Sequence, residues 1–303
     1  MNWKSALKRH SHLYHALKSA LARASDARAR LTGRPRARIP RKLRRDFTLN
    51  GRIQVLYGYA DNSRNRPITY APAQIDAACS RIAAGELGHY RQVDAWLYEA
   101  LQRHSIRGKH VAIMGSADQG FGPWYECVAL QHGARPTTID YNPIDFRDPR
   151  LHFLKAPIDI ATVPPFDAAL SVSSFEHDGL GRYGDPLDPN ADLKAMRQMK
   201  RLLKQDGLLF LTVPLGRDKV VFNIHRIYGR IRLPLLLEGW TVMDRFGFDD
   251  ALLDRDTGYG WEPTRFMRGP RGVEEQPIHP ECPSYEPVWV LRNSTPFTSD
   301  VER

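Results

Sequence analysis

The sequence predicts an α/β fold built on a doubly wound, mostly parallel sheet, with a helical extension before it. From residue 109 onward, short apolar runs alternate with helical patterns, which is typical of a parallel sheet. A glycine-rich turn follows the first of these runs, and an aspartate ends the second. We therefore expect a ligand at the carboxyl ends of the strands, where the crevice of such sheets lies.

The expected core has five parallel strands followed by an antiparallel C-terminal hairpin at the sheet edge. Helical patterns at 124–132 and 191–204 fill two crossovers, and Gly207 is suited to a left-handed cap after the second helix. No helical pattern of normal length separates the last two strand candidates, which predicts the hairpin. The strands are expected at 110–114, 136–140, 151–154, 166–172, 208–213, 241–248 and 288–292.

Length and composition favour a folded protein without membrane spans. A chain of 303 residues, of which 42% are hydrophobic and 26% charged, can bury a substantial core. No run approaches the roughly 18 apolar residues that a membrane span needs, and no secretory signal is expected because no apolar block follows the cationic N-terminal region. Cys79, Cys127 and Cys282 are far apart and lack metal-binding spacing. We expect free thiols and a cytoplasmic location, with peripheral attachment at the inner membrane face as the alternative.

Basic residues are concentrated in a first segment, residues 1–46. It holds 14 of the 44 Lys and Arg residues but only 2 of the 34 acidic residues. Residues 3–31 have the pattern of an amphipathic helix, and prolines interrupt the basic linker at 34–45. Three interpretations stay open: contact with an anionic membrane surface or an acidic partner, packing on the chain's own domain, and an organellar transit peptide. Nucleic-acid binding is disfavoured because aromatic residues are not interleaved with the charges.

The second segment, 47–106, is expected to cover the core and lead into it. Weak alternation at 47–70 predicts either a short hairpin around Asn50-Gly51 or an extended cover. Apolar residues recur at helical intervals through 72–104, with a break at Gly85 and Gly88. The third segment, 107–303, holds the sheet and every candidate site residue.

The turn after the first strand has the composition of a ligand-binding loop. Gly115, Gly120 and Gly122 let the backbone approach a ligand, and the next helix presents its N-terminus there. Asp140 ends the second strand, where a carboxylate accepts hydrogen bonds from both hydroxyls of a ribose. The predicted cofactor-binding residues are Gly115, Ser116, Gly120, Gly122, Asp140, Tyr141 and Ser173.

Polar side chains follow the fourth and fifth strands at the same edge of the sheet. His177 lies between two acids, and a histidine near an acid is a candidate general base, although a helix-capping role is the alternative. The predicted catalytic, proton-handling residues are His177, Asp178 and His225. The predicted substrate residues are Glu176, Arg182, Tyr183, Asp185 and Arg226. No metal is expected, because carboxylate-rich loops such as this one are common without an ion.

Several segments carry a resemblance to known families. The glycine loop, Asp140 and the stretches FDAALSVSSFEH and MKRLLKQDGLLFLTVPLG together resemble class I S-adenosylmethionine-dependent methyltransferases. The stretches SSFEHDGLGRYGDPLDPNADLKAM and NIHRIYGRIRLPLLLEGW look like an uncharacterised family, domain of unknown function 268, seen in nematodes and bacteria. The resemblance covers roughly residues 107–245. It implies a Rossmann-like methyltransferase sheet, S-adenosyl-L-methionine as cofactor and methyl transfer as the reaction.

The sequence departs from the usual methyltransferase pattern at the glycine loop. Ile113 stands two residues before the first glycine, where an acidic residue is usual. The glycines are spread over GSADQGFG instead of a tight G-x-G-x-G. The residues that would hold the methionine part of the cofactor are therefore open, with Asp118 as one candidate.

The loop at 181–189, rich in Arg, Tyr and Asp, favours O-methylation of a polar small molecule or a saccharide related to surface glycans. A base must take the hydroxyl proton, and an ordinary histidine pKa near 6.5 is expected for it. Two other classes stay open: a catalytically inactive scaffold with this fold, and a nucleotide-dependent oxidoreductase. The missing compact G-x-G-x-x-G argues against the oxidoreductase, and the near-neutral body argues against a nucleic-acid methyltransferase.

Overall fold

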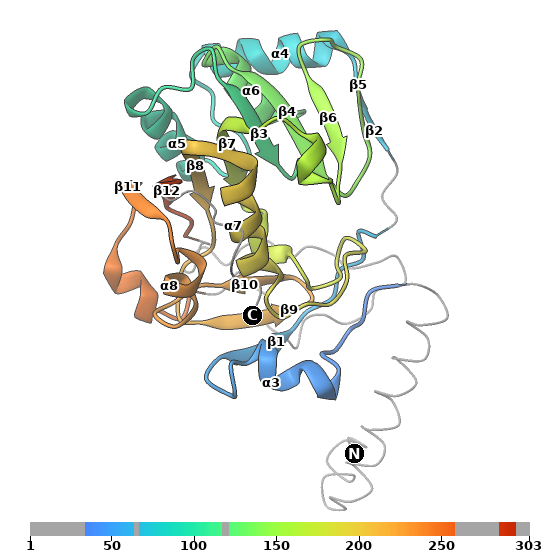
Figure 1. The fold of residues 1–303 in the computed structure, drawn as a ribbon, viewed down its shortest axis with the longest axis vertical. Coiled ribbons are helices and arrows are strands. Elements are labelled where there is room, and N and C mark those ends of the chain that lie inside the picture. Colours follow the sequence, from blue (N-terminus) through green and yellow to red (C-terminus); the bar gives the residue numbers. More distant parts are fainter. Residues whose placement is uncertain (1–33, 64–66, 117–120, 258–284, 295–303) are drawn as a thin grey trace, which may run out of the picture.

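The computed structural model describes residues 34–63, 67–116, 121–257 and 285–294 (Figure 1). Its main sheet contains β3 (His110–Met114), β4 (Arg135–Asp140), β6 (His152–Lys155), β7 (Phe166–Val172), β8 (Leu203–Thr212), β11 (Thr241–Phe246) and β12 (Val288–Arg292). The strand order is β11-β12-β8-β7-β3-β4-β6. The five neighbouring strands β6, β4, β3, β7 and β8 are parallel to one another. Strand β12 is antiparallel to both β8 and β11. The predicted sheet, with five parallel strands and an antiparallel C-terminal hairpin, is confirmed.

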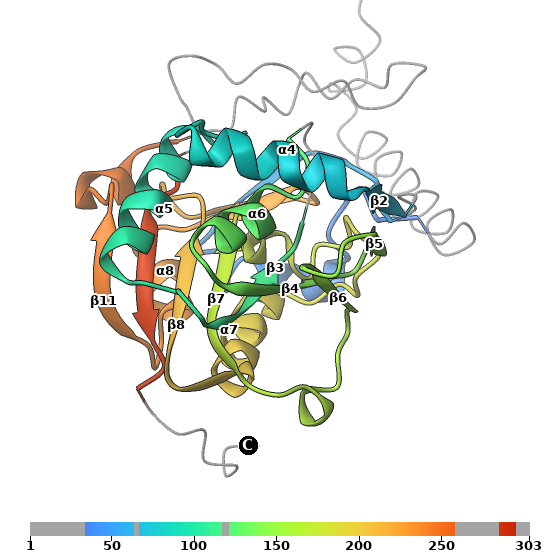
Figure 2. The same ribbon diagram turned by 90° about the horizontal axis from the view of Figure 1, so that it is seen from above.

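Helices cover both faces of this sheet (Figure 2). Three of them, α4 (Pro72–Ala83), α5 (Gln92–Arg103) and α6 (Trp124–Gln131), lie on one face, and α7 (Ala191–Leu202) lies on the other. Successive side chains of a strand point to opposite faces, so Val111 and Ile113 enter the core under α4 to α6 while Ala112 enters the core under α7. No helix in the described part of the chain has the length and apolarity that crossing a membrane requires.

Two small sheets join the N-terminal region to later parts of the chain. In the first, β1 (Gln54–Tyr57) is parallel to β9 (Lys219–Phe222), and β10 (His225–Ile227) is antiparallel to β9. In the second, β2 (Ile68–Tyr70) is parallel to β5 (Ile144–Phe146). The remaining elements are α3 (Arg44–Phe47), α8 (Arg232–Leu236) and single 3₁₀ turns at Arg41–Leu43, Ile160–Thr162, Phe175–His177 and Asp250–Asp254.

The hairpin predicted around Asn50-Gly51 is wrong, and the extended cover is what forms. Both residues have positive φ, but they join α3 to β1, which pairs with β9 and not with a neighbouring segment. Burial of apolar side chains favours the pairing of β1 with β9, because Phe47 and Ile53 pack in one cluster with Phe222. The predicted helices before the sheet are confirmed, with Gly85 at a φ of +80° after α4.

The boundary between α7 and β8 differs from the sequence expectation. The helix ends at Leu202, and the left-handed residue is Asp206, with a φ of +61°, instead of Gly207. The pairing of β12 with β8 continues into this turn, because Asn293 accepts from the Asp206 amide and donates to the Gly207 carbonyl. A Cβ on Gly207 would lie 2.9 Å from the Lys204 carbonyl oxygen, so the glycine permits a close backbone approach.

A buried ion cluster joins α7, β10 and α8. Asp192 accepts hydrogen bonds from Arg232 Nη2 at 2.5 Å and Nε at 2.8 Å, and Arg226 Nε lies 3.7 Å from the same carboxylate. These three side chains are at most 1% exposed. Burial alone would raise the pKa of Asp192, but the charges of Arg226 and Arg232 outweigh it and hold that pKa below its ordinary value. The cluster therefore stays ionised inside the protein.

Asp192→Asn tests how much this cluster stabilises the fold. The change keeps the side-chain shape but leaves two buried guanidinium groups without a counter-charge, so the free energy of unfolding should fall by about 3–5 kcal/mol. Denaturant titration measures it. As a control on the same helix, Lys194→Met breaks the exposed ion pair with Asp188 and should cost less than about 1 kcal/mol. Equal losses in the two variants would contradict a central role for Asp192.

Candidate functional site

The candidate site begins at the turn after β3. Gly115 has a φ of +72°, and its amide donates to the Ile139 carbonyl on β4 at 3.0 Å. A Cβ on Gly115 would lie 2.7 Å from Ser174 Oγ, so glycine keeps this turn close to the end of β7. Gly122, also with positive φ, lies just before α6. Gly120, the third predicted glycine, and Asp118 lie outside the described residues.

Asp140, at the end of β4, binds the turn after β3. Its Oδ2 accepts a hydrogen bond from the Ser116 amide at 2.7 Å, and its Oδ1 accepts from the Asn142 amide at 2.6 Å. Burial raises the pKa of this half-buried carboxyl despite the two amides. The structure thus joins two of the predicted cofactor residues, Ser116 and Asp140, in one unit at the carboxyl edge of the sheet.

The loop after β7 faces this unit. Burial, followed by the charges of Asp178, Asp185 and Asp140, raises the pKa of Tyr141 to about 12. Tyr183 also has a raised pKa, first through burial and then through nearby acids that include Asp140 and Asp185. Tyr141, a predicted cofactor residue, and Tyr183, a predicted substrate residue, therefore share Asp140 and Asp185 as acidic neighbours.

Ser173 connects β7 to this loop in a strained conformation. Its φ is +49°, in the left-handed region that few residues other than glycine adopt. Its amide donates to Thr212 Oγ1 at 3.0 Å, and its hydroxyl donates to Glu176 Oε1 at 2.5 Å. Glu176 is fully buried, so Ser173 holds a carboxyl in the interior next to the glycine turn.

The two histidines predicted for proton handling lie together, but burial changes their titration. Their ring centroids are 6.3 Å apart. Burial, followed by the charge of Arg182, lowers the pKa of His177 to about 3, and burial, followed by His177, lowers the pKa of His225 well below its usual value. The expected histidine pKa near 6.5 is therefore wrong. His177 Nδ1 lies 2.6 Å from the Ile224 carbonyl oxygen, which makes Nδ1–H the donor and leaves Nε2 as an acceptor.

Arg226 and Asp185 shape the loop from within. Arg226 is fully buried, and its guanidinium donates to the carbonyls of Asp178 at 2.6 Å and Glu176 at 3.3 Å. Asp185, which is 8% exposed, accepts from the Gly181 and Tyr183 amides. These two predicted substrate residues thus bind backbone groups of the loop itself.

Arg182 lies closer to the surface than these two residues. Its Nε donates to Asn62 Oδ1 at 2.9 Å, and its guanidinium lies over the Tyr183 ring. The Asn62 amide in turn donates to the Arg182 carbonyl, also at 2.9 Å. The segment after β1 is thereby attached to the loop, so the N-terminal region closes one side of the site.

Sequence reasoning missed two fully buried acids. Glu286, two residues before β12, is fully buried and accepts from Thr212 Oγ1 at 3.4 Å. Asp94, at the start of α5, is fully buried and accepts from Tyr125 Oη at 2.8 Å; burial raises its pKa to about 6. In the sequence, Glu286 is marked only by its position two residues before the apolar run of β12. No group of acids, histidines and cysteines in the described ranges has the arrangement of a metal site.

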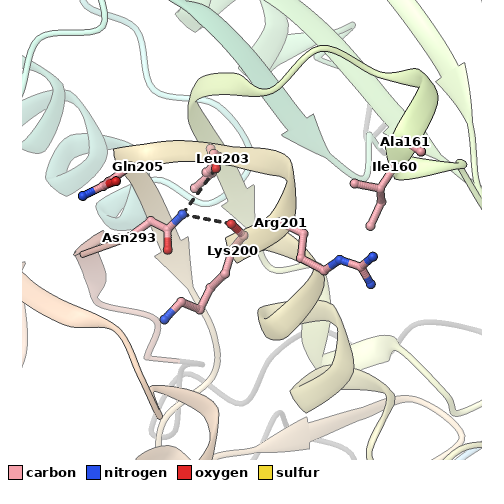
Figure 3. A pocket seen from close by; sticks show the side chains of 7 residues that line it. All are labelled: Ile160, Ala161, Lys200, Arg201, Leu203, Gln205 and Asn293. Atoms are coloured by element: carbon pink, nitrogen blue, oxygen red, sulfur yellow. Dashed lines mark hydrogen bonds between the residues drawn. The ribbon is translucent and has the colours of Figure 1, made fainter. Parts of the chain in front are cut away.

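A hollow of about 400 Å³ lies at the opposite edge of the sheet (Figure 3). It is lined by Ile160, Ala161, Lys200, Arg201, Leu203, Gln205 and Asn293. Figure 3 shows Asn293 donating to the carbonyls of Lys200 and Leu203, at 2.9 and 3.3 Å. These residues lie at the amino ends of the parallel strands, whereas ligands of such sheets bind at the carboxyl ends. We therefore place the candidate site at Gly115 and Asp140 and not in this hollow.

Comparison with known proteins finds one matching family and several similar structures. The family described as Caenorhabditis protein of unknown function, DUF268, matches residues 109–253. This match confirms the resemblance that the loop after β7 and the segment around β10 carry. No curated protein matches the chain.

Several solved structures are similar to this chain at low sequence identity. An S-adenosylmethionine-dependent methyltransferase from Clostridium acetobutylicum is 8% identical, with a TM-score of 0.38 over 73% of this chain and 98% of the other. A SAM dependent methyltransferase from Aquifex aeolicus is 13% identical, with a TM-score of 0.36 over 74% and 98%. Phosphoethanolamine N-methyltransferase 2 from Haemonchus contortus is 12% identical, with a TM-score of 0.36 over 51% of this chain and 38% of that enzyme. At sequence identities this low, the function of the chain must be inferred from its own candidate site.

His177 should make stability depend on pH. The unfolded histidine takes up a proton near pH 6.5 and the folded one only near pH 3. The unfolded state therefore binds more protons, and stability falls as the pH drops through this window. His177→Asn keeps a donor for the Ile224 carbonyl but does not titrate. Between pH 7 and pH 5, its free energy of unfolding should fall by about 2 kcal/mol less than that of the parent. Denaturant titrations at both pH values measure the difference, and identical pH dependence would rule out the buried neutral state.

Proposed function

We propose that this chain is an S-adenosylmethionine-dependent methyltransferase that methylates a hydroxyl of a polar small molecule or a saccharide related to surface glycans. The observation that carries the proposal is the junction at the carboxyl edge of the sheet. There the Ser116 amide, directly after Gly115, donates to Asp140 at 2.7 Å. A glycine turn and a strand-end carboxylate joined in this way are what an adenosyl ligand needs. The methyltransferase-like motifs of the sequence support the same reading.

The residues at this junction fit such a cofactor. Each carboxylate oxygen of Asp140 uses one lone pair on a backbone amide and retains another, so the pair of oxygens can accept from two ribose hydroxyls. Gly115 adds no side chain between the ends of β3 and β7. When bound, S-adenosylmethionine supplies a methyl group activated by its sulfonium sulfur.

The task of the chain is then to hold the acceptor and take its proton. The acceptor oxygen must lie about 3 Å from the methyl carbon, in the space between Asp140 and the loop after β7. His177 Nε2 has the geometry of the proton acceptor, because its Nδ1–H is already used by the Ile224 carbonyl, but its pKa of about 3 makes it a weak base. Glu176 Oε1, which accepts from the Ser173 hydroxyl, lies 3.6 Å from this nitrogen. His177 would take the hydroxyl proton of the acceptor as that oxygen is methylated. Asp178 and His225 are the alternative bases.

Asp140→Ala tests the cofactor site. The variant lacks the acceptors for both ribose hydroxyls, so affinity for S-adenosylmethionine should fall by on the order of 2–3 kcal/mol. Calorimetric titration measures it. The control Asp145→Ala removes an exposed acid on β5 and should bind like the parent. Unchanged affinity in Asp140→Ala would refute the assignment, and binding of a nicotinamide nucleotide by the parent in place of S-adenosylmethionine would favour an oxidoreductase.

The basic N-terminal segment is proposed to attach the protein to anionic membrane surfaces. Residues 1–33 hold 7 Lys and Arg against 1 Asp. From residue 34 the chain is engaged with the domain, because Ile39 and Phe47 are buried in one cluster with Phe222. A truncation that tests attachment and keeps these buried residues therefore ends at residue 33.

Deleting residues 1–33 should weaken binding to vesicles that contain phosphatidylserine. Each basic residue near such a surface contributes about 1 kcal/mol, and salt screens the attraction. Co-sedimentation at low and high salt compares the truncated chain with the parent. We expect a folded truncated chain with weaker, less salt-dependent binding. Equal binding of both chains would show that the segment does not mediate attachment.

A further inference from the structure

The hollow at the amino edge of the sheet lies outside the proposed methyl-transfer site. Its volume of about 400 Å³ is in the size range of small-molecule sites. The last turn of α7, the 3₁₀ turn Ile160–Thr162 and Asn293, directly after β12, form its wall. In Figure 3, Arg201 lies near Ile160 on one side of the hollow, and Gln205 lies near Asn293 on the other. A ligand that spans it would therefore meet different groups at its two ends.

The lining of this hollow is positively charged. Of the described residues that line it, Lys200 and Arg201 are cationic and none is acidic. The acids next to the lining already have contacts of their own. Asp159 accepts from an amide of the neighbouring 3₁₀ turn, and Asp206 faces Arg292 at 3.9 Å. Burial lowers the pKa of Lys200, so an anion in the hollow would stabilise its charged form.

Asn293 weakens the repulsion that the end of a helix would exert on such an anion. Free carbonyls give the C-terminal end of a helix a negative partial charge. The Nδ2 group of Asn293 donates to three carbonyls at the end of α7, on Lys200 at 2.9 Å, Leu203 at 3.3 Å and Lys204 at 3.2 Å. Because all three neighbours are acceptors, Nδ2 must face them and Oδ1 is turned away. This oxygen is buried and has no hydrogen-bond partner within the described ranges.

The two ends of the hollow thus favour opposite kinds of ligand group. A buried acceptor such as Asn293 Oδ1 destabilises the protein until a donor reaches it. Arg201 has a planar guanidinium whose donors match the oxygens of a phosphate. Apolar side chains of Ile160 and Leu203 line the hollow as well and can contact the carbon atoms of a ligand.

We propose that this hollow binds a small phosphate ester that carries hydroxyl groups, such as a sugar phosphate. The phosphate lies at Arg201, and a hydroxyl donates to Asn293 Oδ1. A phosphate monoester carries a charge of about −2 at neutral pH, which matches the two cations of the lining. The site lies at the edge of the sheet opposite Asp140, so the proposal does not depend on the methyltransferase function.

Calorimetric titration of the full chain compares D-glucose 6-phosphate with D-glucose and with inorganic phosphate at neutral pH. Glucose 6-phosphate should bind at least about tenfold more tightly than either, because only this compound carries both the phosphate and the sugar hydroxyls. Arg201→Gln should weaken its binding by about tenfold or more, since hydrogen bonds to charged groups are the stronger kind. Gln205→Glu keeps the size of an exposed side chain, adds an acid to the lining and should also weaken binding. The control Arg197→Gln removes an exposed cation of α7 that does not line the hollow and should bind like the parent.

Hydrogen exchange on the parent locates the ligand without any variant. Glucose 6-phosphate should slow exchange within 200–205 and leave the Ser116 amide unchanged. Equal affinity for glucose 6-phosphate and inorganic phosphate, or no binding of the sugar phosphate, would overturn the proposal. Equal losses in Arg201→Gln and Arg197→Gln would reduce the effect to overall charge and overturn it too. So would protection at Ser116 in place of 200–205, because the sugar phosphate would then occupy the cofactor edge.

Discussion

The buried carboxylate of Asp192, held between Arg226 and Arg232, is the interaction on which the shape of the site depends. Arg232 faces it from α8 with two hydrogen bonds, and Arg226 approaches it from β10. The guanidinium of Arg226 also donates to carbonyls at both ends of the loop after β7, at Asp178 and at Asp188. One charge cluster thereby fixes α7, α8 and the loop that carries the predicted substrate residues. Such a set is stable only when complete, because each unpaired member would be a buried charge.

Burial by this framework sets the chemical character of the site. Away from water, the charged form of an ionisable side chain is disfavoured unless an opposite charge lies beside it. The pKa of Asp178 is raised by burial and then by Asp185, whereas the pKa of His177 is lowered. Both groups are therefore biased toward their neutral forms, as a proton donor and a proton acceptor. A polar ligand entering this space would find hydrogen-bonding groups already positioned, with little competition from solvent.

The main sheet could be predicted from the sequence, because its strands are short apolar runs that alternate with helical patterns. The sequence also placed Gly115 next to Asp140, since the carboxyl ends of parallel strands meet at one edge. The pairing of 54–57 with 219–222 was beyond prediction, because no local pattern connects segments so distant in the chain. The same holds for Glu286 beside Thr212 and for Asp192 between its arginines. The low pKa of His177 follows from burial and from Arg182, and both depend on tertiary structure.

Hydrogen–deuterium exchange with and without S-adenosylhomocysteine tests the central claim, that the cofactor binds at the carboxyl edge of the sheet. The amides of Ser116 and Asn142 both donate to Asp140, and the Ser173 amide donates to Thr212. The account predicts that the ligand slows exchange at these amides and leaves 200–205, which line the hollow at the opposite edge, unchanged. Protection confined to 200–205, or no protection in either place, would contradict it.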